Sequence, residues 1–116
     1  GGCYFYRAEP MWEKPPGPPY AILQGSMRLN ASWPAAEGCH PPDRGTVTWI
    51  GEGPHFHIAL ADHDEWGAGP GPFGVVLGDG LAVAGAITAL PTKVEMWGTT
   101  RAQVLLEHLP FALAAE

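Results

Sequence analysis

Glycine and proline recur along the whole chain and restrict what it can fold into. The sequence holds 16 glycines and 13 prolines among its 116 residues, about a quarter of the chain. Long helices are disfavoured, because proline lacks a backbone donor and glycine costs about 1 kcal/mol in a helix interior. The same residues are typical of tight turns between short strands. The pattern predicts one β-rich domain, a size that suits a chain of this length.

Short stretches with alternating or β-branched residues lie between these turns and are typical of strands. Tyr20–Ser32 is expected to form two strands with a bend or bulge at Gly25-Ser26. Four further strands are expected at these ranges: Thr46–Ile50, His55–Ala61, Val75–Leu77 and Thr92–Trp97. The expected fold class is α+β, with a twisted, mostly antiparallel β-sheet and few short helices.

The first 19 residues combine aromatic side chains with a run of prolines. Lys14–Pro19 cannot lie inside a helix or a central strand, because four of its six residues are prolines without an N–H group. We therefore expect residues 1–19 to form an extended arm or a loop.

Two later stretches have ambiguous patterns. Leu81–Ala89 is apolar and rich in small residues, so it fits either a strand or a buried helix. Arg101–Leu109 has the composition of a helix, with Thr99 or Thr100 as its N-cap and Pro110 near its end.

The charge of the chain is acidic and bears on its partners. The formal net charge is −6, from 12 acidic and 6 basic residues. Sequence-independent binding to DNA requires a dense set of Lys and Arg side chains that displace the counterions of the phosphates. We therefore expect no appreciable binding to duplex DNA by this domain alone at physiological salt. The six basic residues are scattered along the sequence: Arg7, Lys14, Arg28, Arg44, Lys93 and Arg101.

Cysteine use and hydropathy predict where such a chain works. Cys3 and Cys39 form no C-x-x-C pair and are too few for a disulfide framework, so a reducing, cytoplasmic location is expected. No apolar run approaches the roughly 18 residues of a membrane-spanning helix, and the start lacks the pattern of a signal peptide. We expect no membrane partner.

The motif with the most chemical content is His55-Phe56-His57 within a predicted strand. Residues two apart on a strand point to the same side, about 6–7 Å apart, so two imidazoles can share one metal ion. Alternation also places Phe56, Ile58 and Leu60 on the opposite side, which we expect to be the core. Two interpretations remain open: a metal site in a small cleft, or a pair of surface histidines on a solvated face.

A metal site at this strand needs a third ligand, since Zn²⁺ usually takes three or four from the protein. His40 and His63 lie in predicted loops that could fold back toward the strand, whereas His108 is expected at the surface. The candidate metal ligands are His55, His57 and His63, with zinc as the candidate ion. Carboxylates just past the strand could supply a ligand or orient an imidazole: Asp62, Asp64 and Glu65.

Several other motifs carry no prediction of function. The Gly/Pro-rich run GAGPGPFG lacks the G-x-G-x-x-G spacing of a nucleotide cradle, and its prolines remove N–H donors. No G-x-S-x-G elbow is present in the sequence. Cys39 and His40 are adjacent, so they cannot face each other as a nucleophile and its base.

From His55 onward the sequence resembles the plants-and-prokaryotes-conserved (PCC) domain. That family has a strand of the form H-h-H-h-x-h-x-D, where h is apolar. The strand is followed by a polar turn, a glycine segment, small residues and a closing strand. The resemblance covers about residues 20–98. It rests on His55, His57, Leu60 and Asp62, on Leu77, Gly78, Gly80 and Lys93–Trp97, and upstream on Leu23, Gly25 and Leu29.

The resemblance implies an α+β, mostly antiparallel fold and a homotrimer. Many prokaryotic members hold a metal with three histidines. The third has no counterpart here, because Val75 or Phe73 falls at its position depending on the alignment. A third ligand must then come from His63, Asp62 or a neighbouring chain. Plant members of this family, which is described as DNA-binding, bind DNA through AT-hooks, and no R-G-R-P hook occurs in this sequence.

Cupins are the alternative resemblance. They also carry H-x-H on a barrel strand followed by a carboxylate, here Asp62 where cupins usually have Glu. The second cupin motif finds Pro72-Phe73-Gly74, but Leu77 stands where its histidine would be. Two functions therefore remain open. One is a small oligomeric PCC-like module, DNA-binding by resemblance alone. The other is a cupin-like metal-dependent enzyme of small-molecule metabolism.

Overall fold

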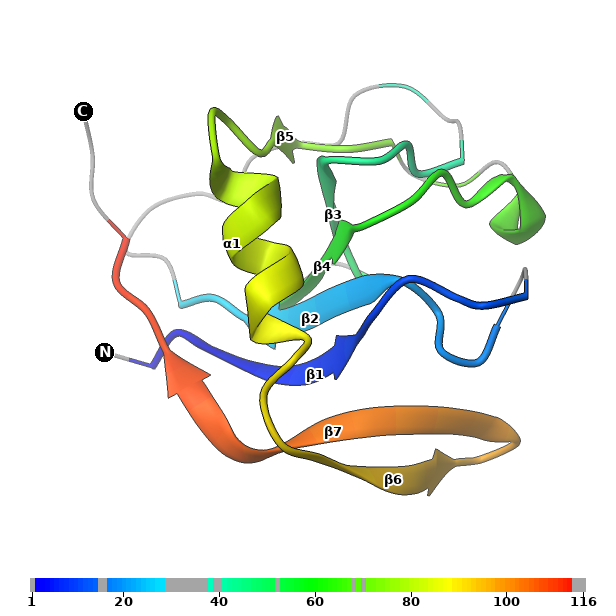
Figure 1. Ribbon diagram of the computed structural model, residues 1–116. Coiled ribbons are helices and arrows are strands. Elements are labelled where there is room, and N and C mark those ends of the chain that lie inside the picture. The colour runs from blue at the N-terminus through cyan, green and yellow to red at the C-terminus, as the bar shows by residue number, and fades with distance from the viewer. Residues whose placement is uncertain are drawn as a thin grey trace.

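The computed structural model describes residues 2–14, 17–28, 38, 41–51, 53–67, 69 and 71–113. Within these ranges seven strands form one sheet in the order β5-β3-β4-β2-β1-β7-β6, and every neighbouring pair is antiparallel (Figure 1). The strands are β1 (Tyr4–Glu9), β2 (Ile22–Ser26), β3 (Thr46–Trp49), β4 (His55–Ala59), β5 (Gly74–Val75), β6 (Thr92–Trp97) and β7 (Thr100–Pro110). The expected antiparallel sheet is confirmed.

The helical content of the described residues is small. It consists of α1 (Gly80–Ile87) and one 3-10 turn, η1 (Asp64–Trp66). The stretch that fitted either a strand or a buried helix thus forms a helix. No described helix has the length and apolar character needed to cross a bilayer.

The hydrophobic core lies between α1 and one face of the sheet, which the helix crosses in Figure 1. Ala84 of the helix packs with Ala8 of β1 and Leu23 of β2. A second cluster, around Phe56 and Trp49, adjoins the first through Phe5 and Ile58. The apolar residues of β4 therefore face the core as predicted.

The expectation of an N-terminal arm is wrong for its first half. Tyr4–Glu9 forms β1, which lies between β2 and β7 near the middle of the sheet. The register shift between Phe5 and Arg7 lets Phe5 and Ala8, three residues apart, both pack into the core. The proline run begins only after the strand ends. Pro10 follows Glu9 directly, and the described residues from Pro10 to Tyr20 form neither helix nor strand.

The expectation of a helix over Arg101–Leu109 is also wrong, because Thr100–Pro110 is strand β7. β7 pairs with β6 from Trp97↔Thr100 to Thr92↔Leu105, and with β1 on its other side. Thr99 lies in the hairpin turn beside Gly98, whose φ of 66° favours glycine, and caps no helix. Pairing on both sides outweighs the weak helix preference of leucine, alanine and glutamine.

The bulge expected at Gly25-Ser26 occurs in the neighbouring strand instead. Both residues lie within β2, and the pairing of β1 with β2 shifts between Phe5 and Arg7. A Cβ on Gly25 would come within 2.5 Å of the Tyr4 carbonyl oxygen, so glycine permits the close approach of the two strands. The second strand expected within Tyr20–Ser32 falls largely on residues outside the described ranges.

Candidate functional site

A row of polar residues crosses the sheet on the face opposite α1. Thr48 of β3 pairs with His57 of β4, His57 pairs with Gln24 of β2, and Gln24 pairs with Arg7 of β1. Residues directly opposite in a sheet point to the same face. Four strands thus bring together side chains that lie far apart in the sequence.

A hydrogen-bonded chain connects one end of this row to His55. Arg7 Nη1 donates to Gln24 Oε1 at 3.0 Å, and Gln24 Nε2 donates to the Tyr6 hydroxyl at 2.7 Å. The same hydroxyl lies 2.9 Å from His55 Nδ1 and donates to it when that ring nitrogen carries no proton. Burial raises the pKa of Tyr6 above its ordinary value of 10.0, and the hydrogen bond from Gln24 partly opposes this.

Arg7 is held in a buried ion pair beneath two aromatic rings. Its Nε donates to Glu9 Oε2, and Glu9 is fully buried. The second carboxylate oxygen of Glu9 accepts from the backbone N–H of Tyr20 at 3.2 Å. The guanidinium lies 5.1 Å from the Trp97 ring and 5.8 Å from that of Tyr20. The positive charge is thereby neutralised and shielded on this face.

His57 and Thr48 form the least satisfied part of the row. Their side chains are buried, at 8% and 6% exposure, yet His57 Nδ1 and Thr48 Oγ1 have no hydrogen-bond partner among the described residues. Burial first of all, and then nearby His63 and Arg7, together lower the pKa of His57 from 6.5 to about 4. The imidazole is therefore neutral at pH 7. Buried polar atoms without partners on two directly paired residues are uncommon in a folded protein.

These two residues line a pocket of about 380 Å³, called here the His57 pocket. Trp66 of η1 contributes one wall, with its ring 5.6 Å from the His57 ring and nearly perpendicular to it. The described lining contains no Asp, Glu, Lys or Arg. The complete described lining is Pro42, Thr48, Trp49, Ile50, Gly51, His57, Trp66, Gly67 and Gly69.

His63 fixes the wall of the pocket. Its ring is fully buried and stacks on Trp66 at 3.7 Å with an interplanar angle of 2°. Nδ1 lies 2.7 Å from Glu65 Oε2 and Nε2 lies 3.0 Å from the Ala21 carbonyl oxygen. Because an ionised carboxylate and a carbonyl only accept, both contacts are hydrogen bonds when both ring nitrogens carry a proton. Glu65 thus orients an imidazole, as the sequence indicated it could.

The three candidate metal ligands do not come together as a metal centre. His55 and His57 lie on the same side of β4 as predicted, but His55 is exposed, bonded to Tyr6 and absent from the pocket lining. Both ring nitrogens of His63 are occupied. Among the described residues no three His, Cys, Asp or Glu side chains are grouped to hold a metal ion. The residues therefore do not fit a three-histidine zinc site, and His40 lies outside the described ranges.

Of the remaining acidic candidates, Asp62 binds a backbone N–H group and Asp64 faces the solvent. Asp62 Oδ1 accepts from the backbone N–H of Arg44 at 2.8 Å, and Asp64 is exposed in η1.

Sequence reasoning missed Thr48, Gln24 and Trp66. Thr48 belongs to a predicted strand, but only the pairing of β3 with β4 places it beside His57.

Comparison with family models, with curated proteins and with solved structures finds no match to this chain. The resemblance to the PCC domain and the alternative resemblance to cupins thus remain predictions from sequence. Function is therefore inferred from the site itself.

Proposed function

We propose that this chain is a binding domain for a small, neutral, ring-shaped molecule held in the His57 pocket. The observation that carries the proposal is the pair of partnerless atoms, His57 Nδ1 and Thr48 Oγ1, on residues that line one pocket. A buried polar atom without a partner costs about 1–3 kcal/mol. A ligand that pairs with both atoms, once the two side chains turn them toward the pocket, would recover that cost.

The chemistry of the lining defines the ligand class. Neutral His57 and the uncharged described lining favour an uncharged molecule. Trp66 offers an aromatic wall for a flat ring. A hydroxyl can donate while a neutral imidazole nitrogen accepts, so the matching group carries an N–H beside a C=O. Cyclic amides and imides have this arrangement.

The features of the His57 pocket favour a binding module over a metal-dependent enzyme. The resemblance implies a PCC-like oligomer described as DNA-binding, and the ligand pocket adds a binding site to such a module. The cupin-like alternative requires a metal, which the arrangement of His55, His57 and His63 does not support. DNA binding receives no support from charge: two of the six basic residues, Arg7 and Lys93, are in ion pairs.

Uracil is a suitable probe, because it is a flat neutral ring with N–H groups beside carbonyls. Titration into ¹⁵N-labelled protein is expected to give saturable shifts in the backbone amides of Thr48 and His57 and in the Trp66 indole. Uracil methylated on both ring nitrogens keeps the carbonyls but loses the donors, and it should bind more weakly. Absence of saturable shifts at these three residues, or equal binding of both probes, would refute the proposed site.

A matched variant tests the same contact from the protein side. Thr48→Val keeps the shape of the side chain but removes the hydroxyl. Its affinity for uracil is expected to fall about fivefold, the equivalent of one neutral hydrogen bond of about 1 kcal/mol. Tyr4→Phe serves as the control, since Tyr4 is not among the pocket-lining residues. An unchanged affinity in Thr48→Val would contradict the role of the hydroxyl.

A further inference from the structure

Strand β6 forms an outer edge of the sheet. In the described part of the chain it is bonded to β7 on one side and to no strand on the other (Figure 1). Every second residue of an edge strand directs its backbone N–H and C=O away from the sheet, where another strand can pair. We propose that two copies of this chain pair antiparallel through β6, with Val94 on the two-fold axis.

The charges of β6 select this register. When Val94 is central, Lys93 of each copy lies opposite Glu95 of the other, which creates two cross-strand ion pairs. Centring the pairing on Lys93 or on Glu95 would instead put like charges opposite each other, which destabilises a sheet. Both side chains are available, at 58% and 41% exposure, and pair with each other at 3.3 Å within the strand.

The other face of β6 is apolar and uncovered. Val94 is 48% exposed and Met96 is 62% exposed. In the proposed register Val94 meets Val94 of the second copy, and Met96 meets Thr92 of the second copy. The pairing therefore removes apolar surface from water on one face and joins opposite charges on the other.

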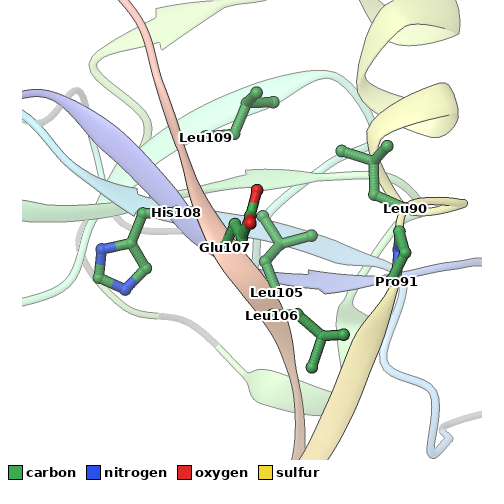
Figure 2. Close-up of a pocket in the computed structure, with 7 residues that line it drawn as sticks. All are labelled: Leu90, Pro91, Leu105, Leu106, Glu107, His108 and Leu109. Carbon is green, nitrogen blue, oxygen red and sulfur yellow. The ribbon is translucent and has the colours of Figure 1, made fainter.

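An apolar groove of about 470 Å³ continues this surface. It is lined by Leu90, Pro91 and Leu105–Leu109, and Figure 2 shows Leu90 and Leu105 on the groove while His108 is directed away from them. Thr92 directly follows Pro91 and pairs with Leu105. Met96 of the second copy, placed opposite Thr92, therefore lies beside the end of the groove.

Charged residues on an edge strand commonly discourage pairing with other chains. Here the charges complement those of an identical antiparallel strand, and exposed Val94 and Met96 lie on its other face. A two-fold pairing of identical strands closes as a dimer. This arrangement thus differs from the trimer that the PCC resemblance implies, and it does not depend on the proposed ligand.

Light scattering after size exclusion, over a concentration series, tests the pairing. Wild type is expected to approach twice the chain mass of 12.3 kDa. Lys93→Glu and Glu95→Lys each put like charges opposite each other, so each variant is expected to stay monomeric. The double exchange restores complementarity and should restore the dimer. Lys14→Glu makes the same change of net charge away from β6 and should leave the dimer intact.

Hydrogen exchange supplies a second readout that needs no variant. Amides of β6 in wild type are expected to exchange more slowly at high than at low protein concentration, because pairing protects the free edge. A wild-type mass of one or three chains throughout the series would overturn the proposal. So would a dimer that survives both single exchanges, or a double exchange that is folded but monomeric.

Discussion

Thr48 of β3 lies directly opposite His57 of β4, and in the described part of the chain each keeps one buried polar atom without a hydrogen-bond partner. The rest of the row is satisfied: Gln24 is bonded to both Arg7 and Tyr6, and Arg7 to Glu9. The two partnerless atoms thus belong to residues that line the His57 pocket. Polar groups that remain unpaired in an otherwise consistent core are expected where a site has a function.

The buried ion pair on the polar face should be essential to stability. Glu9→Gln removes the charge that neutralises Arg7, whose side chain is only 11% exposed. We expect a loss of about 3 kcal/mol in the free energy of unfolding, because a buried charge is left without its partner. Urea unfolding checks the value.

A matched exposed pair provides the control for this change. Glu95→Gln breaks the contact with Lys93, where both side chains are well exposed, and should have little effect on stability in monomeric protein. Equal losses for Glu9→Gln and Glu95→Gln would contradict the special role of the buried pair.

The hydroxyl of Tyr6 connects Gln24 to His55. Tyr6→Phe keeps the ring but removes the hydroxyl, so the free energy of unfolding is expected to fall by about 1 kcal/mol. Tyr4→Phe changes a neighbouring tyrosine whose ring stacks on His108 at 4.5 Å, a contact that phenylalanine retains. If thermal and urea unfolding give the same result for both variants, the hydrogen-bonded chain contributes nothing measurable.

Burial of neutral His57 predicts a pH-dependent stability. In the unfolded chain this imidazole takes up a proton near pH 6.5, but in the folded protein only near pH 4. The unfolded state therefore binds more protons in this window, so stability is complete above pH 6.5 and is lost as the pH falls to about 4. The expected contribution is about 3 kcal/mol.

A variant isolates this contribution from the carboxylates that titrate in the same range. His57→Gln keeps a polar side chain that does not titrate, so its stability should fall less steeply between pH 6.5 and 4 than that of wild type. Urea unfolding at several pH values measures the difference. Parallel curves for the two proteins would show that His57 is not buried in its neutral form.

Zinc binding can be tested separately from ligand binding. Because His63 is doubly bonded and His55 is bonded to Tyr6, calorimetric titration of Zn²⁺ is expected to give equally small heats for wild type and His57→Ala. Strong binding that is lost in His57→Ala would contradict the observed arrangement of the three histidines and restore the metal hypothesis.

Strands whose conformation depends mainly on their own residues were predicted correctly from the sequence. Thr92–Trp97 alternates clearly and forms β6 with the expected bounds, and the side of β4 that faces the core followed from Phe56 and Ile58. β1 and β7 were mispredicted, because a distant partner decides their conformation. Tyr4–Glu9 is extended between strands that begin at Ile22 and at Thr100.

The candidate site was predicted in part for the same reason. The spacing of His55 and His57 identified the strand that carries the site, and spacing within one strand needs no knowledge of pairing. Thr48 lies beside His57 only because of the register in which β3 pairs with β4. Trp66 lies beside His57 while its ring stacks on His63. The sequence also could not reveal that His57 lies buried and neutral, because its burial depends on both neighbouring strands.

The proposed binding function requires that the hydroxyl of Thr48 is retained for a ligand at a cost to the unliganded fold. Urea unfolding of wild type and Thr48→Val, each with and without uracil, tests it most directly. Without uracil the variant is expected to be more stable by about 1 kcal/mol, because a buried unpaired group is removed. With uracil, wild type should gain more stability than the variant, since binding stabilises the folded state according to affinity. A variant that is less stable than wild type without uracil, and gains equally from it, would contradict the account.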